Sequence, residues 1–156
     1  LVMDLDQLFT MLNDLAHHEG LTDHFKLTKT RLEQELFGMN ADWNCLVATD
    51  SLENVMGFCF YTYTSINRVY NPSPMIQIDD LYIAPNYRKA KIGHKLIQEL
   101  AVIAQNNNIS CFNVWCVKGN EQGQKFYQKL GGEKLAYIDV YVMEVSKLLD
   151  QASAGI

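Results

Sequence analysis

The fold is decided by residues 78–94, which read IDDLYIAPNYRKAKIGH. A β-branched and aromatic run comes first, and Pro85 ends it because proline has no backbone N–H to give to a strand ladder. Three cations, Arg88, Lys89 and Lys91, then lead directly into an apolar-striped helix. The stretch therefore predicts a strand, a polar turn and a helix start. Free backbone N–H groups, the positive end of a helix dipole and side-chain charge converge at such a turn, which favours binding of a pyrophosphate group.

The composition indicates one ordinary folded domain with no membrane anchor. The chain has 156 residues, 48% hydrophobic and 20% charged, which is enough to bury a core without covalent staples. No run approaches the roughly 20 apolar residues of a membrane span, and no secretory signal is visible, so we expect a cytoplasmic protein. The net charge of −5 argues against a nucleic-acid partner. Four cysteines without paired spacing predict reduced thiols and no metal site.

Helical and strand patterns alternate on both sides of this stretch. The expected helices cover about 4–18, 28–38, 92–106 and 120–130. The expected strands cover about 45–48, 55–66, 75–83, 109–117, 133–137 and 140–145, with a loop at 67–74. The first two strands should form an antiparallel hairpin, and a helix between the strands at 75–83 and 109–117 makes those two parallel. We therefore expect one α/β domain over residues 1–156 with a mixed sheet.

Two motifs make the chain resemble the GNAT N-acetyltransferases. The first is LYIAPNYR at 81–88, followed by Gly93 and an apolar helix; the second is Asn120 followed by FYQKLG at 126–131. Within that superfamily the chain most resembles the diamine (spermidine/spermine and thialysine) acetyltransferases, nearly from end to end. The resemblance implies a GNAT fold: a mixed, mostly antiparallel central sheet with a splayed parallel strand pair, flanked by about four helices. It also implies a homodimer, with Phe58–Tyr63 and the C-terminal strands as candidate surfaces.

The sequence departs from the family pattern at several positions. Lys91 stands where the family places the first glycine of its Arg/Gln-x-x-Gly-x-Gly/Ala loop, so it adds a charge but also a Cβ where a backbone should approach a pyrophosphate. Asp79 replaces a family glutamate, and Gly123 replaces a small residue of the second motif. The family's first strand is nearly absent, because only residues 1–3 precede Asp4, and we expect it to be truncated.

The resemblance implies acetyl-CoA as the co-substrate and indicates which residues hold it. The backbone amides of Leu81, Tyr82 and Ile83 are expected at the thioester, where the family splays its parallel strands. Asn120 is expected to contact CoA or an active-site water, although an asparagine there also makes a plain helix N-cap. The other expected cofactor-binding residues are Arg88, Lys89, Ala90, Lys91, Ile92, Gly93, His94 and Gly123.

The resemblance also implies the residues of catalysis. Tyr127 corresponds to the family's general acid, which protonates the leaving sulfur, and Asp79 to a base acting through a water. From the residues alone, Tyr127 could equally be a half-buried helix residue and Asp79 a solvated strand carboxylate. Strand side chains alternate, so we expect Asp80 on the opposite face from Asp79. The expected substrate-binding residues are His18, Glu19, Asp79, Asn113, Val114 and Trp115.

These features together predict an enzyme that transfers acetyl directly from acetyl-CoA to a small primary amine. An alkyl amine with a pKa near about 10 is almost wholly protonated at pH 7, so the site must first accept a proton. We expect a diamine-like or polyamine-like substrate. The alternatives are another amine, such as an amino acid, a peptide N-terminus or an aminoglycoside, and a non-catalytic CoA-binding regulatory module.

Overall fold

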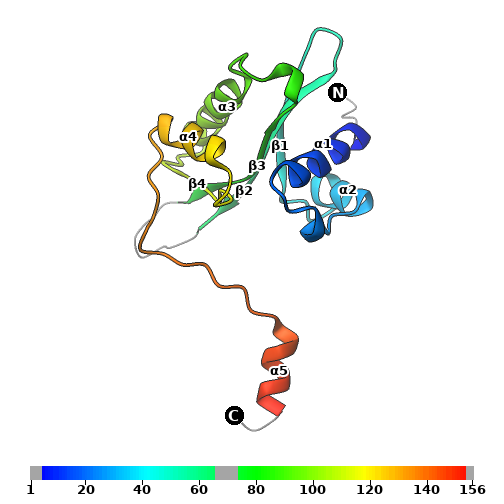
Figure 1. Cartoon of the computed structure of the whole chain (residues 1–156), viewed down its shortest axis with the longest axis vertical. Helices are drawn as coiled ribbons and strands as arrows, with labels where there is room; N and C mark the ends of the chain where they lie inside the picture. Colours follow the sequence, from blue (N-terminus) through cyan, green and yellow to red (C-terminus); the bar gives the residue numbers. More distant parts are fainter. Residues whose placement is uncertain (1–4, 66–73, 154–156) are drawn as a thin grey trace. The chain divides into compact units, whose positions relative to one another are not determined.

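The protein is described here from a computed structural model, which describes residues 5–65 and 74–153. The strand expected at 1–3 and almost all of the loop expected at 67–74 lie outside these ranges. The chain falls into two compact units, Leu1–Asn120 and Glu121–Ile156. The described part of the first unit holds a four-stranded sheet with helices on both of its faces (Figure 1). Every helix of the described part is too short or too polar to cross a membrane.

The sheet has the order β1-β2-β3-β4. Its strands are β1 (Asn44–Thr49), β2 (Val55–Thr64), β3 (Met75–Ile83) and β4 (Phe112–Val114). The β1–β2 and β2–β3 pairs are antiparallel and the β3–β4 pair is parallel, so the predicted hairpin and the predicted parallel unit are both confirmed. Asp50 closes the hairpin turn, because its side chain accepts hydrogen bonds from the backbone N–H groups of Leu52 and Asn54 at 2.8 and 2.9 Å.

Three α-helices cover the sheet. They are α1 (Leu5–His18), α2 (Lys29–Phe37) and α3 (Ile92–Asn106), with short 3₁₀ turns η1 (Thr22–His24) and η2 (Pro85–Tyr87). The α2 helix begins as the sequence predicts, because the Thr28 hydroxyl accepts a hydrogen bond from the Arg31 N–H at 3.2 Å. The α1 and α2 helices pack on one face of the sheet and α3 packs on the other, which gives three layers.

Each face of the sheet has its own apolar core. Phe58 and Phe60 of β2 point toward α1 and α2 and are fully buried. Cys59 and Ile76 point the other way, toward Leu100 of α3, and are also fully buried. Side chains of this size each stabilise the fold by roughly 1.5–3 kcal/mol when they leave water. The sheet is therefore held from both sides.

The central place of β2 overturns one expectation about assembly. Phe58–Tyr63 was expected as a dimer surface, but Phe58, Phe60 and Tyr61 are used by the two cores, and Tyr63 is 48% exposed. Over Phe58–Tyr61, β2 pairs with β1 on one side and β3 on the other, so this part has no free edge, and its buried side chains are not available to a second chain. The expectation is therefore wrong for Phe58–Tyr61.

Burial also sets the state of the cysteines. Cys59 is buried, Cys45, Cys111 and Cys116 are partly buried, and all of them are free thiols. Burial raises the pKa of Cys59 to about 12, so its thiol stays protonated and packs as an apolar group.

The β4 strand is shorter than predicted. Only Phe112–Val114 of the expected 109–117 is a strand. Ile109 packs in the core beside α3, whereas Trp115 is 65% exposed. The β3–β4 ladder ends at the pair Ile78–Val114, and no described strand continues along the rest of β3.

The second unit contains α4 (Glu121–Lys129) and α5 (Val145–Ser153). The prediction of strands at 133–137 and 140–145 is wrong, because the described residues between α4 and α5 form no strand. Their apolar side chains are exposed, Val142 by 93%. A β-branched pattern makes a strand only where a partner accepts its backbone hydrogen bonds, and these residues have no such ladder in the described structure.

The close approach of β2 and β3 predicts that Gly57 cannot carry a side chain. A Cβ at Gly57 would lie 2.7 Å from the Tyr82 carbonyl oxygen and 2.5 Å from Ile83 Cδ1. We expect Gly57→Ala to lower the free energy of unfolding by about 1–3 kcal/mol, because the strands must separate to admit the methyl group. The measurement is urea unfolding followed by circular dichroism. The matched control is Gly119→Ala, where a Cβ meets no atom within 4 Å; equal losses in the two variants would contradict the prediction.

Candidate active site

A β-bulge in β3 brings two carboxylates to one face of the sheet. Tyr61 of β2 pairs with Ile78, but the next residue, Phe60, pairs with Asp80, so Asp79 is an extra residue in β3. The extra residue resets the alternation of side chains. The expectation that Asp80 lies on the opposite face from Asp79 is therefore wrong.

The contacts of the two carboxylates place both beside α1. Asp79 accepts a hydrogen bond from the Trp43 indole N–H at 3.0 Å, and Trp43 packs with the core under α1 and α2. Asp80 lines a cavity together with Leu12 and Leu15 of α1. Sequence reasoning missed this, because a bulge leaves no mark in a period-two pattern.

The β3 strand has an open edge after the bulge. The Ala84 N–H donates to the Met56 carbonyl oxygen of β2 at 3.0 Å. By the alternation of an antiparallel ladder, the Tyr82 N–H also points toward β2, while the N–H groups of Leu81 and Ile83 point away from it. They face the side where the β4 ladder has ended. Of the three predicted amides, Leu81 and Ile83 thus lie at the open edge and Tyr82 lies in the ladder.

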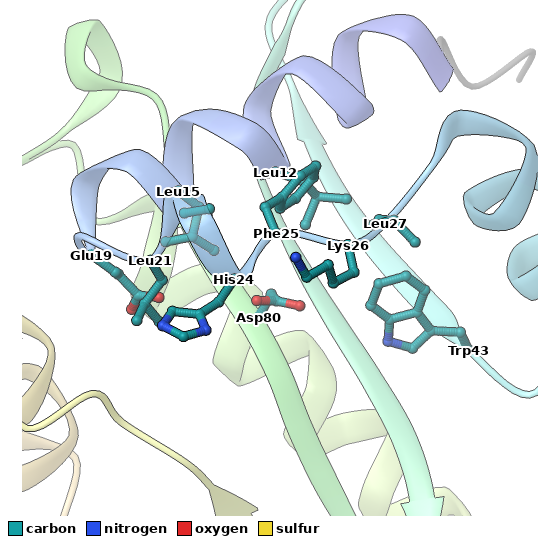
Figure 2. A pocket seen from close by; sticks show the side chains of 11 residues that line it. Leu12, Leu15, Glu19, Leu21, His24, Phe25, Lys26, Leu27, Trp43 and Asp80 are labelled. Atoms are coloured by element: carbon teal, nitrogen blue, oxygen red, sulfur yellow. The ribbon is translucent and has the colours of Figure 1, made fainter.

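The cavity beside Asp80 has a volume of about 260 Å³ (Figure 2). Its walls come from the end of α1, from the segment that links α1 to α2, from Trp43 before β1 and from β3. Its charged lining residues are Glu19, Lys26 and Asp80, and His24 lies among them. Trp43 is held in place by Phe60, with ring centroids 4.3 Å apart. A small molecule with charged ends fits such a lining.

The electrostatics of the cavity favour a proton acceptor at neutral pH. Burial raises the pKa of Asp80 to about 6, and the nearby charges of Asp79 and Glu19 add to the effect. Burial also raises the pKa of Asp79, although hydrogen bonds from Trp43 and Thr62 act in the opposite direction. A carboxylate whose pKa lies near the working pH is suited to general acid–base catalysis.

Two predicted residues, Asn120 and Glu19, meet at the rim of this site. Asn120 Nδ2 donates a hydrogen bond to Glu19 Oε1 at 3.2 Å, and the Asn120 N–H donates to the Val117 carbonyl oxygen at 2.9 Å. The loop after β4 is therefore tied to the end of α1. Asn120 orients the Glu19 carboxylate, which was predicted for the substrate.

The other residues predicted for the substrate lie outside the lining of the cavity. His18 is exposed at the end of α1. Asn113 Nδ2 donates to Gln77 Oε1 of β3 at 2.7 Å, farther along the sheet. Val114 packs in the core on the α3 side, which is the opposite face, and Trp115 is mostly exposed.

Sequence reasoning missed several lining residues of the cavity. Lys26 and His24 lie between the helices expected at 4–18 and 28–38, and Trp43 precedes the strand expected at 45–48; none of these residues was predicted for the site. The available signal was the pair Phe25 and Leu27, which anchors this segment in the core beside α1. An anchored loop holds its polar side chains in fixed places.

The cationic turn follows β3 and begins α3. Arg88 folds back, and its Nε donates to the Ile83 carbonyl oxygen at 3.1 Å. Lys89 and Lys91 are exposed and have left-handed backbones, with φ of 69° and 60°. Tyr87 anchors the turn, because its hydroxyl donates to Asp50 Oδ2 at 3.1 Å.

The remaining residues predicted to bind the cofactor lie at the start of α3. Lys91 is the N-cap of α3 and makes no side-chain capping bond. Gly93 and His94 lie in the first turn, Ala90 is exposed before it, and Ile92 is buried in the core. Exposed cations at the N-terminus of a 15-residue helix, beside the open edge of β3, favour binding of a phosphate group there.

Two further predicted residues belong to the second unit. Tyr127 and Gly123 lie in α4, and both are partly buried. The Tyr127 ring packs edge-on against Phe126, with centroids 5.3 Å apart. The Tyr127 carbonyl oxygen accepts a hydrogen bond from the Gly132 N–H at 2.9 Å, which ends the helix.

A sheet that opens beside a cationic helix start, next to a carboxylate-lined cavity, suits an enzyme that binds a phosphate-bearing molecule and a small cation. The comparison with protein families agrees. The model of the acetyltransferase (GNAT) family matches residues 6–132, which is most of the chain. The chain belongs to the GNAT family and is an acetyl-CoA-dependent N-acetyltransferase.

Known proteins show the same relationship. A thialysine N-epsilon-acetyltransferase of Sus scrofa is 29% identical over 136 residues, which cover 85% of this chain and 80% of that protein. The spermidine/spermine N(1)-acetyltransferase-like protein 1 of Homo sapiens is 24% identical over 139 residues, covering 85% of this chain and 20% of that protein. The solved structure of AAC(6')-Iy in complex with the bisubstrate analog CoA-S-monomethyl-acetylneamine has a TM-score of 0.73 at 16% identity, covering 92% of this chain and 93% of that one.

The left-handed backbone at Lys91 predicts a gain in stability from glycine. A residue with a Cβ is disfavoured there by about 1–2 kcal/mol, and glycine is not. We expect Lys91→Gly to raise the free energy of unfolding by about 0.5–1 kcal/mol after the extra freedom of the unfolded chain is subtracted. The control is Lys95→Gly, an exposed residue inside α3, which should lose about 1 kcal/mol. Chemical unfolding of both variants decides the matter, and a loss in Lys91→Gly would contradict the prediction.

Proposed function

We propose that this enzyme acetylates a small, diamine-like primary amine that binds in the cavity lined by Asp80. The observation that carries the proposal is the pair of carboxylates, Glu19 and Asp80, that face one small cavity. Two carboxylates suit a substrate with two positive charges. The names of the relatives, thialysine and spermidine/spermine acetyltransferases, support an amine of this kind.

The first chemical task is to remove a proton from the bound ammonium group. The sequence hypothesis gave this role to Asp79 through a water. Because the bulge puts Asp79 and Asp80 on one face, we assign the proton to this pair, with Asp80 toward the amine and Asp79 beside it. Asp80 has the raised pKa that a base working near neutral pH needs.

Acetyl-CoA supplies the acetyl group as a thioester. The residues that would hold it are the open edge of β3 and the turn before α3. The Leu81 and Ile83 N–H groups would donate hydrogen bonds to the carbonyl oxygen as negative charge grows on it. Lys89 and Lys91 would bind phosphate by charge. Tyr127 would give its phenolic proton to the sulfur as the carbon–sulfur bond breaks, a role that rests on the match of Phe126 and Tyr127 to the family motif.

The organisation of the whole protein is also a proposal. We propose that 1–156 functions as one GNAT domain, because the family match at 6–132 includes parts of both units. A cytoplasmic homodimer without a nucleic-acid partner follows from the family resemblance and from the net charge of −5.

The activity of Asp80→Asn tests the proposed base. With acetyl-CoA and cadaverine, and a thiol-release readout, we expect kcat/KM to fall by roughly a hundredfold or more. The control is Asp139→Asn, which changes an exposed residue between α4 and α5 and should keep wild-type activity. Thiol release from no amine in a panel of diamines, amino acids and aminoglycosides would refute the proposed function.

The effect of pH on activity and on stability tests whether Asp80 gains and loses a proton near pH 6. A base must be ionised, so wild-type kcat/KM should rise as the pH passes about 6. The raised pKa means that the folded state holds this proton more tightly than the unfolded chain, so stability is lost as the pH rises through about 6. Asp80→Asn should therefore be more stable than wild type at pH 8 and similar at pH 4. Thermal unfolding at both pH values checks this, and equal stability at pH 8 would contradict it.

Tyr127→Phe tests the proposed acid. Removal of the phenolic proton should lower kcat by roughly a hundredfold and leave KM for the amine nearly unchanged, because only the leaving group loses its donor. Tyr137→Phe is the control, since Tyr137 is 77% exposed. Full activity in Tyr127→Phe would show that another group protonates the sulfur.

A further inference from the structure

We propose that Trp43 is a positioning residue for proton transfer in this enzyme. Its indole N–H fixes the Asp79 carboxylate, and its ring forms a wall of the cavity that Asp80 also lines. Trp43 thereby joins the surface that the amine contacts to the pair of carboxylates that receives the proton. The inference rests on the proposed function, because it adds a residue to that same site.

The contact between Trp43 and Asp79 is a directed hydrogen bond. The indole nitrogen, Nε1, lies 3.0 Å from Asp79 Oδ2 and donates its proton to it. An indole N–H can only donate, so it favours a carboxylate oxygen that carries negative charge. Thr62 of β2 gives Asp79 a second hydrogen bond. Asp79 is thus held by one donor from the residue before β1 and by another from β2, and together these donors set the orientation of its carboxylate.

Packing fixes the Trp43 ring, so the fold sets the direction of its N–H. The ring packs against Phe60 of β2, with centroids 4.3 Å apart and an angle of 30° between the ring planes. Phe60 is itself fully buried and packs edge-on against Phe58, with centroids 5.0 Å apart. Trp43 therefore adjoins the apolar core under α1 and α2. A donor on a ring that is held in this way stays aimed at its acceptor, which is what a preorganised site requires.

The same ring borders the cavity. Trp43 lines it together with Asp80 and with Leu12 and Leu15 of α1, and Figure 2 shows the ring and the Asp80 carboxylate among the side chains around it. Asp79 is not one of the described residues that line the cavity, although it precedes Asp80 in the chain. Trp43 contacts both the space for the amine and the carboxylate behind it, so a change in this side chain can affect the wall, the donor or both.

An uncharged donor at this place suits a cationic substrate. Burial and the charge of Asp42 raise the pKa of Asp79, and the donors Trp43 and Thr62 oppose them. No lysine or arginine in the part of the chain that the structure describes forms a salt bridge with Asp79 or Asp80. A cation at ion-pair distance would lower the pKa of these carboxylates and would compete with the ammonium group of the amine for them. The indole N–H instead orients Asp79 and leaves the negative charge of the pair to the substrate.

A double-mutant cycle with Trp43→Phe and Asp79→Ala tests the inference. Trp43→Phe removes the N–H but keeps an aromatic ring against Phe60. With cadaverine, or with the best amine of the panel, we expect it to lower kcat by about tenfold and to change KM by less than about threefold, because the wall remains while Asp79 loses its donor. In the Asp79→Ala protein, Trp43→Phe should change kcat by less than about twofold, because the indole then has no carboxylate to hold. The control is Tyr63→Phe, which removes a hydroxyl that interacts with Tyr61 on the α3 side of the sheet and should keep the wild-type kcat.

The outcomes separate this inference from the proposed function. An unchanged kcat in Trp43→Phe would show that Trp43 is at most a wall, and an equal fall of kcat in both backgrounds would show that it does not act through Asp79. Either result would overturn the inference while acetyl transfer to amines stands. If no amine of the panel is acetylated, the proposed function fails, and urea unfolding of the same variants at pH 8 decides whether Trp43 positions Asp79. Trp43→Phe should lower the unfolding midpoint of the wild type and leave that of Asp79→Ala unchanged, whereas equal shifts in the two backgrounds would overturn the inference.

Discussion

The bulge at Asp79 is the local constraint on which the site depends. One extra residue in β3 shifts the pairing with β2 and turns the next carboxylate, Asp80, to the same face as Asp79. The same shift points the N–H groups of Leu81 and Ile83 toward the edge where β4 no longer pairs. A regular strand would send Asp80 into the apolar core beside α3 and would keep a different set of amides at the edge. The proposed acceptance of a proton and the proposed binding of a carbonyl oxygen thus both depend on one irregularity of the backbone.

Two neighbouring carboxylates in a poorly hydrated place are costly, and the surroundings offset the cost unequally. Burial raises the pKa of Asp79, while hydrogen bonds from Trp43 and Thr62, which stabilise its ionised form, act in the opposite direction. At Asp80, burial and the charges of Asp79 and Glu19 raise the pKa to about 6. The environments of the two groups therefore differ, because donors oppose the effect of burial at Asp79, whereas Asp80 can gain and lose a proton near neutral pH.

Much of the fold could be predicted because its signals are local. The start of the helix expected at 28–38, the limits of β3 and the apolar stripe of α3 each depend on neighbouring residues, and they are confirmed. The places where prediction failed depend on partners far away in the chain. The β-branched run at 140–145 has the composition of a strand but no ladder, and Asp80 changes face because of its register against β2. The cavity could not be predicted for the same reason, since Lys26, Trp43 and Asp80 meet only after α1 packs on the sheet.

Lys91 stands where the family places a glycine, and it shows that the surrounding structure, and not the residue type, sets the backbone conformation at this position. Lys91 keeps the left-handed φ of 60° that a glycine adopts freely, so the surrounding structure must impose it. The turn is fixed before Lys91 by the bonds from Tyr87 to Asp50 and from Arg88 to Ile83, and after it by the burial of Ile92 and Leu96 under the sheet. Once both ends are fixed, a lysine can occupy the position at a cost of about 1–2 kcal/mol. In the proposed function, the charge of Lys91 at the start of α3 offsets this cost only when an anion is bound. Lysine in place of glycine would then lower the stability of the free protein and increase its attraction for a phosphate.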